Sequence, residues 1–296
     1  MKPLLEIIKD AEKKRVAIGH FNFSNWEQLR AIVSAAARSG QPVILGLSEG
    51  EREFVGSLEA VALARHFREK RGWPVYLNAD HTYSLEKVRE AAEAGFDSVI
   101  FDGAKLPFEE NLSKMKEAVR IAKRVNGKIL VEGELGYIGQ SSQVLSQVPA
   151  GAAIKLEDLP TVEQCKKFVK ETKIDLFAPA VGNVHGIILP QTNADGAPTY
   201  AEKLYIERIG EIKKVIKIPL VLHGGSGLAD GDFKAGIEAG ISIIHISTEL
   251  RVVWRQGMEI SLQEHASDVA PYKILAGVVG RMEEVVERRL RLFGGL

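Results

Sequence analysis

PVYLNADHTYSLEKVREAAEAGFDSVIFDGA, residues 74–104, contains the pattern on which the fold depends. Its two ends, 74–80 and 98–104, are short runs of mainly apolar residues, which predict buried β-strands. Between them, residues 84–95 have helical spacing, begin at Ser84 and end at Gly95, two residue types that are common at helix ends. A strand, a helix and a strand in succession predict a right-handed crossover between parallel strands.

The same alternation runs along the whole chain. Eight strand-like runs occur, apolar on both faces as buried parallel strands are, at 15–23, 42–48, 74–80, 98–104, 128–135, 176–182, 218–225 and 242–248. Alternation of this kind gives either a closed barrel or an open doubly wound sheet, and eight units favour the barrel. We therefore predict one α/β domain over 1–296, a (β/α)8 TIM barrel with an extra N-terminal helix and a C-terminal helical extension over about 272–293.

Composition limits the classes of function. Lys and Arg together number 39, as do Asp and Glu, so no basic excess is available to bind nucleic acid or an anionic membrane. Cys165 is the single cysteine and cannot form an internal disulfide, and the longest apolar run, 241–247, is too short to cross a bilayer. We expect a soluble cytoplasmic protein that binds any anion at a local site.

The histidines gather at one kind of position. Five of the seven lie at or just past the end of a predicted strand: His20, His81, His185, His223 and His245. Because the carboxyl ends of barrel strands open at one mouth, these side chains should converge there. Three imidazoles, from strands three, six and seven, predict a catalytic zinc site with one open position. For any single histidine, the alternative is a hydrogen-bonded structural role.

Asp80 directly precedes His81 at the end of strand three. Adjacent residues at a strand end are expected to point in different directions, so one can bind metal while the other faces the substrate cavity. This placement suits a general acid or base. The alternative is a carboxylate that orients a metal-binding imidazole.

A glycine-rich segment, HGGSG at 223–227, precedes a helical pattern, which predicts a phosphate site made by backbone N–H groups at a helix N-terminus. Strand eight ends at Ser247 and Thr248, and Arg251 lies one turn further on, where barrels often bind phosphate. The alternative is that the glycines only serve a tight turn.

The remaining acids at strand ends are Asp102, Glu132 and Glu134, which could bind a second cation or an alternate metal position. For Glu132 we expect instead a buried acid paired with an Arg or Lys neighbour. Lys105 is the only strand-end lysine, and none closes strand six, so Schiff-base chemistry is a weak competitor.

With these residues placed, the chain resembles the class II, zinc-dependent ketose-bisphosphate aldolases, and within them most the fructose-bisphosphate aldolases. The similarity extends from GHFNFSN (19–25) to ISTELR (246–251). Its motifs include LNADH (77–81), FDGAKLPFEEN (101–111), VEGELG (131–136), GNVHG (182–186) and VLHGGSG (221–227).

The resemblance implies that zinc polarises the C2 oxygen of the ketose and that Asp80 accepts the C4 hydroxyl proton during cleavage. Glu134 matches an acid that can hold the metal in an alternate position, and Asp102 lies in the segment that carries another. Other divalent metals and a monovalent cation are compatible with such a site. The three implied zinc ligands are His81, His185 and His223.

The resemblance also implies two phosphate sites. Gly186, Gly224, Ser226, Ser247 and Thr248 would hold the dihydroxyacetone phosphate end. The other phosphate would lie near Asn22, Ser48 and Arg251.

The chain departs from the family pattern at three places. His245 replaces an asparagine that usually contacts the enediolate, although imidazole can still donate a hydrogen bond. The loop GYIGQSSQVLSQ (136–147) lacks the usual glutamate, for which Tyr137 or an acid at 157–158 could substitute. The usual Asp-Pro-Arg near the C-terminus reads APYK at 270–273, where Lys273 could compensate.

These observations predict an aldolase that cleaves fructose 1,6-bisphosphate into dihydroxyacetone phosphate and glyceraldehyde 3-phosphate. The alternatives are tagatose 1,6-bisphosphate or another ketose phosphate, an isomerase or other lyase with the same site, and a non-catalytic sugar-phosphate-binding relative. The resemblance further implies a homodimer or homotetramer.

Overall fold

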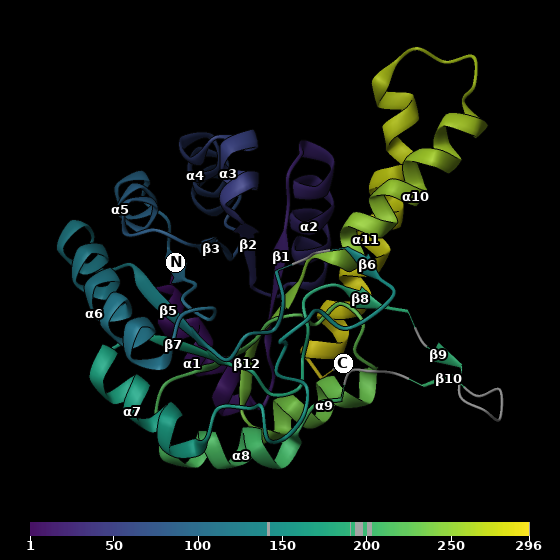
Figure 1. The fold of residues 1–296 in the computed structure, drawn as a ribbon. Coiled ribbons are helices and arrows are strands. Elements are labelled where there is room, and N and C mark those ends of the chain that lie inside the picture. Colours follow the sequence, from purple (N-terminus) through teal and green to yellow (C-terminus); the bar gives the residue numbers. More distant parts are fainter. Residues whose placement is uncertain (141–142, 190, 193–197, 200–202, 296) are drawn as a thin grey trace.

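Eight parallel strands close into a barrel in the computed structural model, which describes residues 1–140, 143–189, 191–192, 198–199 and 203–295 (Figure 1). Each strand pairs with its neighbours in chain order, and the last pairs with the first, so the predicted (β/α)8 barrel is confirmed. The strands are β1 (Ile18–Asn22), β2 (Val43–Leu47), β3 (Val75–Thr82), β4 (Ser98–Phe101), β5 (Leu130–Leu135), β7 (Leu176–Pro179), β11 (Leu220–Leu222) and β12 (Ile241–Ile246).

Helices surround the barrel, and the predicted helices at both ends of the chain are present as α1 and α11. Figure 1 shows that α10 and α11 extend as a hairpin beyond the barrel. No helix within the described ranges is both long and apolar enough to span a bilayer. The helices are α1 (Leu4–Lys14), α2 (Trp26–Ser39), α3 (Glu49–Val55), α4 (Ser57–Arg65) with a π-helical turn (His66–Lys70), α5 (Leu85–Ala94), α6 (Phe108–Val125), α7 (Val162–Thr172), α8 (Ile206–Val215), α9 (Asp230–Ala239), α10 (Thr248–Glu264) and α11 (Pro271–Phe293).

Helix α1 closes the end of the barrel at which the strands begin. Its buried residues Leu4 and Ile8 pack into one cluster with Ile18, Tyr76 and Ile243, which lie near the starts of three strands. A separate, larger apolar layer fills the space between the strands and the outer helices. Apolar packing therefore occupies one end of the barrel and leaves the carboxyl ends of the strands for polar side chains.

The segments after β5 and β7 are joined to each other near the opposite end. Within them, β6 (Val144–Leu145) pairs in parallel with β8 (Ile187–Ile188), and β9 (Gln191–Thr192) pairs with β10 (Pro198–Thr199). The amide of His185 donates to the Ile138 carbonyl at 2.8 Å. These contacts hold the backbone at His185 in place. Parts of the segments after β5 and β7, including 141–142, lie outside the described residues.

Cys165 provides a test of the packing between α7 and the barrel. The residue is fully buried in the apolar layer, and burial raises the pKa of its thiol to about 12. Because the thiolate is the reactive form, we expect alkylation by iodoacetamide at pH 8 to be roughly 10³-fold slower in the native protein than in denaturant. Mass spectrometry at successive times measures the alkylated fraction of Cys165. Equal alkylation rates in the native and denatured protein would contradict the burial of this thiol.

Candidate active site

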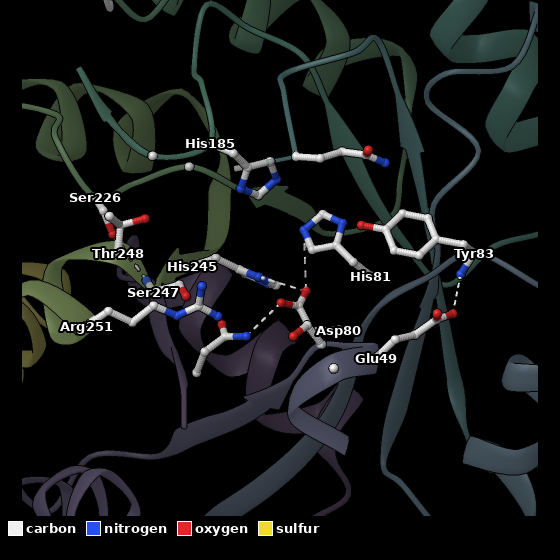
Figure 2. Close-up of a pocket in the computed structure, with 16 residues that line it drawn as sticks. Glu49, Asp80, His81, Tyr83, His185, Ser226, His245, Ser247, Thr248 and Arg251 are labelled. Atoms are coloured by element: carbon white, nitrogen blue, oxygen red, sulfur yellow. Dashed lines mark hydrogen bonds and ion pairs between the residues drawn. The ribbon is translucent and has the colours of Figure 1, made fainter. Parts of the chain in front are cut away.

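A pocket of about 250 Å³ opens at the carboxyl ends of the strands (Figure 2). It brings together side chains from the ends of β1, β2, β3 and β12 and from the loops after β7 and β11. Its wall consists of Asn22, Ser48, Glu49, Gly50, Asp80, His81, Tyr83, Gln140, His185, Gly186, Gly224, Ser226, His245, Ser247, Thr248 and Arg251.

Three imidazoles form a cluster at the inner end of this pocket. The ring centroid of His81 lies 4.6 Å from that of His185 and 4.9 Å from that of His223, and the rings meet edge to face. One ring nitrogen from each of the three lies within 4.8 Å of the others. The structure therefore brings together the three histidines that the sequence predicted as metal ligands.

Two carboxylates fix which nitrogen of each ring carries the proton. Nδ1 of His81 lies 3.0 Å from Asp102 Oδ2, and Nε2 of His223 lies 2.7 Å from Glu132 Oε1. Because a carboxylate accepts a hydrogen bond, the proton of each neutral ring belongs on that nitrogen, and the other nitrogen keeps a lone pair. The two lone-pair nitrogens, His81 Nε2 and His223 Nδ1, face each other at 3.2 Å.

This spacing fits a shared divalent cation. Two nitrogens on one tetrahedral zinc lie about 3.3 Å apart. Nε2 of His185 is buried and has no hydrogen-bond partner among the described residues, so it is free to be the third ligand. Facing lone pairs and an unpartnered buried nitrogen would be unfavourable without a cation or a proton between them.

The electrostatics at His81 favour a positive charge. Burial opposes charge on the imidazole, but the carboxylates of Asp80, Asp102 and Glu134 outweigh burial and raise the pKa of His81 to about 10. In the metal-free protein a proton on Nε2 therefore lies between His81 and His223, at the place that a bound cation would take. Burial, together with Asp102, raises the pKa of Glu134 well above its usual value. Asp102 and Glu134 thus lie beside His81 and could share a cation with it, as the sequence suggested.

The Glu132 carboxylate was expected to pair with an Arg or Lys, but its partner in the structure is a histidine. The carboxylate is 1% exposed and is hydrogen-bonded to the His223 imidazole. Glu132 points into the barrel from β5, where the nearest polar partner is an inward-pointing imidazole. Its position is that of a group that orients a metal-binding histidine.

Asp80 and His81 both line the pocket, although adjacent strand residues were expected to point in different directions. The register of β3 against β4 shifts between Ala79 and Thr82, and His81 has a φ of 33°, in the left-handed region. This irregular backbone turns two consecutive side chains to the same side.

The buried guanidinium of Arg52 holds this irregular segment in place. It donates to the carbonyls of Leu47 at 2.7 Å and Asp80 at 2.9 Å, and to Thr82 Oγ1 at 3.1 Å. It thereby joins the end of β2 to the residues on both sides of His81. Arg52 was not predicted from the sequence, because the register shift of β3 brings the Asp80 carbonyl and the Thr82 hydroxyl within its reach.

Asp80 is held as an ionised acceptor. Its Oδ2 accepts from Asn22 Nδ2 at 2.9 Å, and its Oδ1 lies 3.6 Å from His245 Nδ1 and 3.7 Å from His81 Nε2. Burial would raise its pKa, but His81, together with other imidazoles and the Asn22 amide, lowers the pKa below the usual range. Oδ1 has no hydrogen-bond partner among the described residues and is free to accept a proton.

His245 belongs to a stack of three imidazoles. Its ring lies 3.5 Å from that of His20 and 4.0 Å from that of His223, measured between centroids. Burial and the neighbouring histidines lower the pKa of His245 well below its usual value, so the ring is neutral. His20, whose Nε2 lies 3.2 Å from Asn78 Oδ1, is behind His245 and does not reach the pocket wall.

The predicted phosphate residues lie around the start of α10. Ser226 Oγ accepts from the amides of Ser247 and Glu249, both at 3.2 Å, and Ser247 Oγ is buried without a partner in the described part of the chain. Gly224 has a φ of 60°, and a Cβ there would lie 2.2 Å from the Val184 carbonyl oxygen. Only glycine therefore allows the loops after β7 and β11 to approach so closely.

The HGGSG loop lines the pocket, but the helix that follows it does not. The helix that follows HGGSG, α9, begins at Asp230, and none of its residues lines the pocket. The helix N-terminus at the pocket is instead that of α10, with Ser247 as its N-cap and Thr248 as its first residue. A turn at 226–227, which ends the HGGSG loop, and two further residues precede the start of α9.

At the other end of the pocket, Asn22, Ser48 and Arg251 converge as expected, but all three bond to the carboxylate of Glu51, which sequence analysis missed. The pocket wall also contains Glu49, which accepts from the Tyr83 amide at 2.8 Å.

Tyr83 is a further residue of the pocket wall that was not predicted from the sequence. Its ring lies 6.5 Å from that of His81, and the residue is 45% exposed. Partial burial of the hydroxyl, together with the nearby carboxylates of Asp102 and Asp80, raises its pKa, so it stays protonated. Figure 2 shows the hydroxyl directed toward the imidazoles. Tyr137 and Asp158, two expected substitutes for the loop glutamate, line a separate cavity. Lys105 does not line the pocket but donates a hydrogen bond to Gln140, which does. The position of Tyr83, two residues after His81, was the signal in the sequence.

Comparisons with known proteins show which family the chain belongs to. The model of the class II fructose-bisphosphate aldolase family matches residues 2–295. The 6-phospho-5-dehydro-2-deoxy-D-gluconate aldolase of Shouchella clausii is 33% identical over 295 residues, which are 99% of this chain and 94% of that protein. A probable fructose-bisphosphate aldolase of Bacillus subtilis is also 33% identical, over 98% of this chain and 96% of that protein.

Among solved structures, the YdjI aldolase of Escherichia coli K12 is similar, with a TM-score of 0.78, 28% identity and coverage of 99% of this chain and 98% of that one. The family consists of metal-dependent lyases that act on small sugar phosphates. The match over almost the whole length confirms the resemblance seen in the sequence, and the chain belongs to the class II fructose-bisphosphate aldolase family.

Proposed function

We propose that the chain catalyses the reversible cleavage of a ketose 1-phosphate into dihydroxyacetone phosphate and an aldehyde, with zinc held by His81, His185 and His223. The observation that carries this proposal is the pair of lone-pair nitrogens that face each other at 3.2 Å beside an unpartnered third imidazole. Fructose 1,6-bisphosphate is the first substrate to test, because several relatives carry that name. Other relatives are named for a different phosphorylated substrate, so the identity of the substrate depends on the residues at the distal end of the pocket.

Asp80 is the base in this scheme. When bound, the cation supplies polarisation of the ketose carbonyl. Asp80 Oδ1 takes the proton of the C4 hydroxyl, the C3–C4 bond breaks, and its electron pair passes to the dihydroxyacetone phosphate half as an enediolate. C4 leaves as the aldehyde carbon, and C3 then takes up one proton. Tyr83 lies in the pocket wall and its hydroxyl is protonated. This side chain is therefore suited to donate the proton that C3 takes up.

His245 and the start of α10 position the dihydroxyacetone phosphate half. His245 is neutral and faces the pocket, which suits it to donate one hydrogen bond to a substrate oxygen. The unpartnered Ser247 hydroxyl and the positive end of the α10 helix dipole suit a phosphate. The phosphate residues in this proposal are Gly186, Gly224, Ser226, Ser247 and Thr248. Asp102 and Glu134 would hold the metal in an alternate position next to His81.

We also propose a homodimer or homotetramer. The hairpin of α10 and α11 exposes Val269 and Tyr272, at 93% and 75%, far from the pocket. Large apolar side chains that are this exposed favour burial against another copy of the chain.

Release of dihydroxyacetone phosphate tests the function directly. Zinc-loaded protein is incubated with ketose phosphates, and release is followed by a coupled NADH-dependent reduction. We expect turnover that disappears on chelation and returns with added zinc. Equal turnover by the chelated protein would contradict the proposal.

The metal site predicts the effect of His185→Ala. Because Nε2 of His185 has no partner among the described residues, its loss should leave the fold intact while removing a metal ligand. We expect bound zinc, measured by inductively coupled plasma mass spectrometry, to fall to a small fraction of one per chain. His265→Ala, at the far end of α10, is the matched control and should keep its zinc.

Asp80→Asn separates proton transfer from metal binding. Asn keeps the shape of the side chain but is not a base, so turnover should fall roughly 10²- to 10⁴-fold. Zinc content should stay normal. Loss of zinc in this variant would instead identify Asp80 as a group that orients a ligand.

His245→Ala tests the proposed substrate contact. Loss of one donor to a developing oxyanion lowers kcat by roughly 10²-fold, and we expect a fall of that order. His245→Asn retains an N–H donor and should recover most of the activity. If both variants keep the full kcat/KM, His245 has no role in the reaction.

A further inference from the structure

The carboxylate of Glu51 lies directly behind the distal wall of the pocket, where it is bonded to three residues of that wall. Its Oε2 accepts from Asn22 Nδ2 at 2.9 Å and from the Ser48 amide and hydroxyl at 2.8 and 2.9 Å. Its Oε1 lies 2.5 Å from Arg251 Nη2. Asn22, Ser48 and Arg251 are the residues that the sequence predicted for a second phosphate, so the donors of that site already hold an anion that belongs to the protein.

Little positive charge remains there for a phosphate. Arg251 is the only Lys or Arg in the described pocket wall, and the residues outside the described ranges contain neither type. Lys273, the expected substitute, pairs with Asp268 at 2.7 Å on the outer hairpin. The cation at the distal end is therefore paired with the Glu51 carboxylate behind the wall, and Glu49 adds a further carboxylate to the wall itself.

Glu51 is firmly held in this position. It is 7% exposed and is the third residue of α3, where it forms a capping box with Ser48. A carboxylate in the first turn of a helix is also favoured by the helix dipole. A phosphate dianion would have to displace this carboxylate from Arg251 or lie next to it, and like charges at such a distance repel.

We infer that Glu51 selects against a second phosphate, and that the substrate is a ketose 1-phosphate whose distal end is uncharged and hydroxylated. This inference rests on the proposed function and narrows it. Hydroxyl groups suit the distal wall because each can accept from Arg251 and donate to Asn22 Oδ1, which has no hydrogen-bond partner among the described residues. Glu51 is thus a specificity-determining residue that neutralises the guanidinium of Arg251.

The chain itself indicates a variant that should fold. Helix α7 has the same capping box, with Gln164 in place of a glutamate. Glu51→Gln therefore keeps the acceptor for the Ser48 amide, removes the negative charge and replaces the oxygen that accepts from Arg251 by an NH2 group, which releases the guanidinium. Glu53→Gln makes the same chemical change on the exposed face of α3 and is the matched control.

The experiment compares kcat/KM for the 1-phosphates of fructose and tagatose with that for their 1,6-bisphosphates, measured as release of dihydroxyacetone phosphate. We expect the wild-type protein to prefer a 1-phosphate by about tenfold or more, which corresponds to the loss of one charged contact. Glu51→Gln should move the ratio toward the bisphosphate by a similar factor, and Glu53→Gln should leave it unchanged. Thermal melting verifies that both variants are folded.

The possible results separate the two proposals. If the wild-type protein prefers a bisphosphate, or if Glu51→Gln leaves the ratio unchanged, the inference is overturned while the aldolase function stands. If zinc-loaded protein releases dihydroxyacetone phosphate from none of these ketose phosphates, the proposed function falls and the inference with it.

Discussion

The pairing of inward-pointing imidazoles with buried carboxylates is the interaction on which the site depends. Asp102 holds the Nδ1 proton of His81, and Glu132 holds the Nε2 proton of His223, so the two free nitrogens face one another. Without the carboxylates, each ring could rotate or change tautomer, and the facing arrangement would be lost. The barrel makes the pairing possible, because Glu132 on β5 and His223 after β11 are neighbours in space only when the strands close in order.

The irregular end of β3 is the second requirement. A regular strand would turn Asp80 and His81 to opposite sides, and only one of them would reach the pocket. The shifted register and the left-handed backbone at His81 turn both inward, and the Arg52 guanidinium stabilises that backbone from the adjacent strand end. Local strain at such positions is common where a site needs two functional groups close together.

The sequence predicts the barrel and most of the pocket wall because both follow from periodic patterns. Apolar runs give the strands, and the positions just past those runs give the histidines and Asp80. It does not predict the roles of Arg52, Glu51 and Tyr83, because each depends on a contact between loops from different strands. The sequence also points to α9 rather than α10 as the helix that begins at the pocket, since the length of the segment between HGGSG and α9 is not visible in a pattern. Glu132 was expected to pair with a basic residue, because its imidazole partner becomes a neighbour only in the closed barrel.

X-ray absorption at the zinc edge identifies the atoms that hold the metal. One equivalent of zinc added to the protein should give a first shell with three histidine nitrogens at about 2.0–2.1 Å and one oxygen from solvent or substrate. A shell composed mainly of carboxylate oxygens, or fewer than two imidazoles, would show that the facing nitrogens of His81 and His223 do not form the metal site.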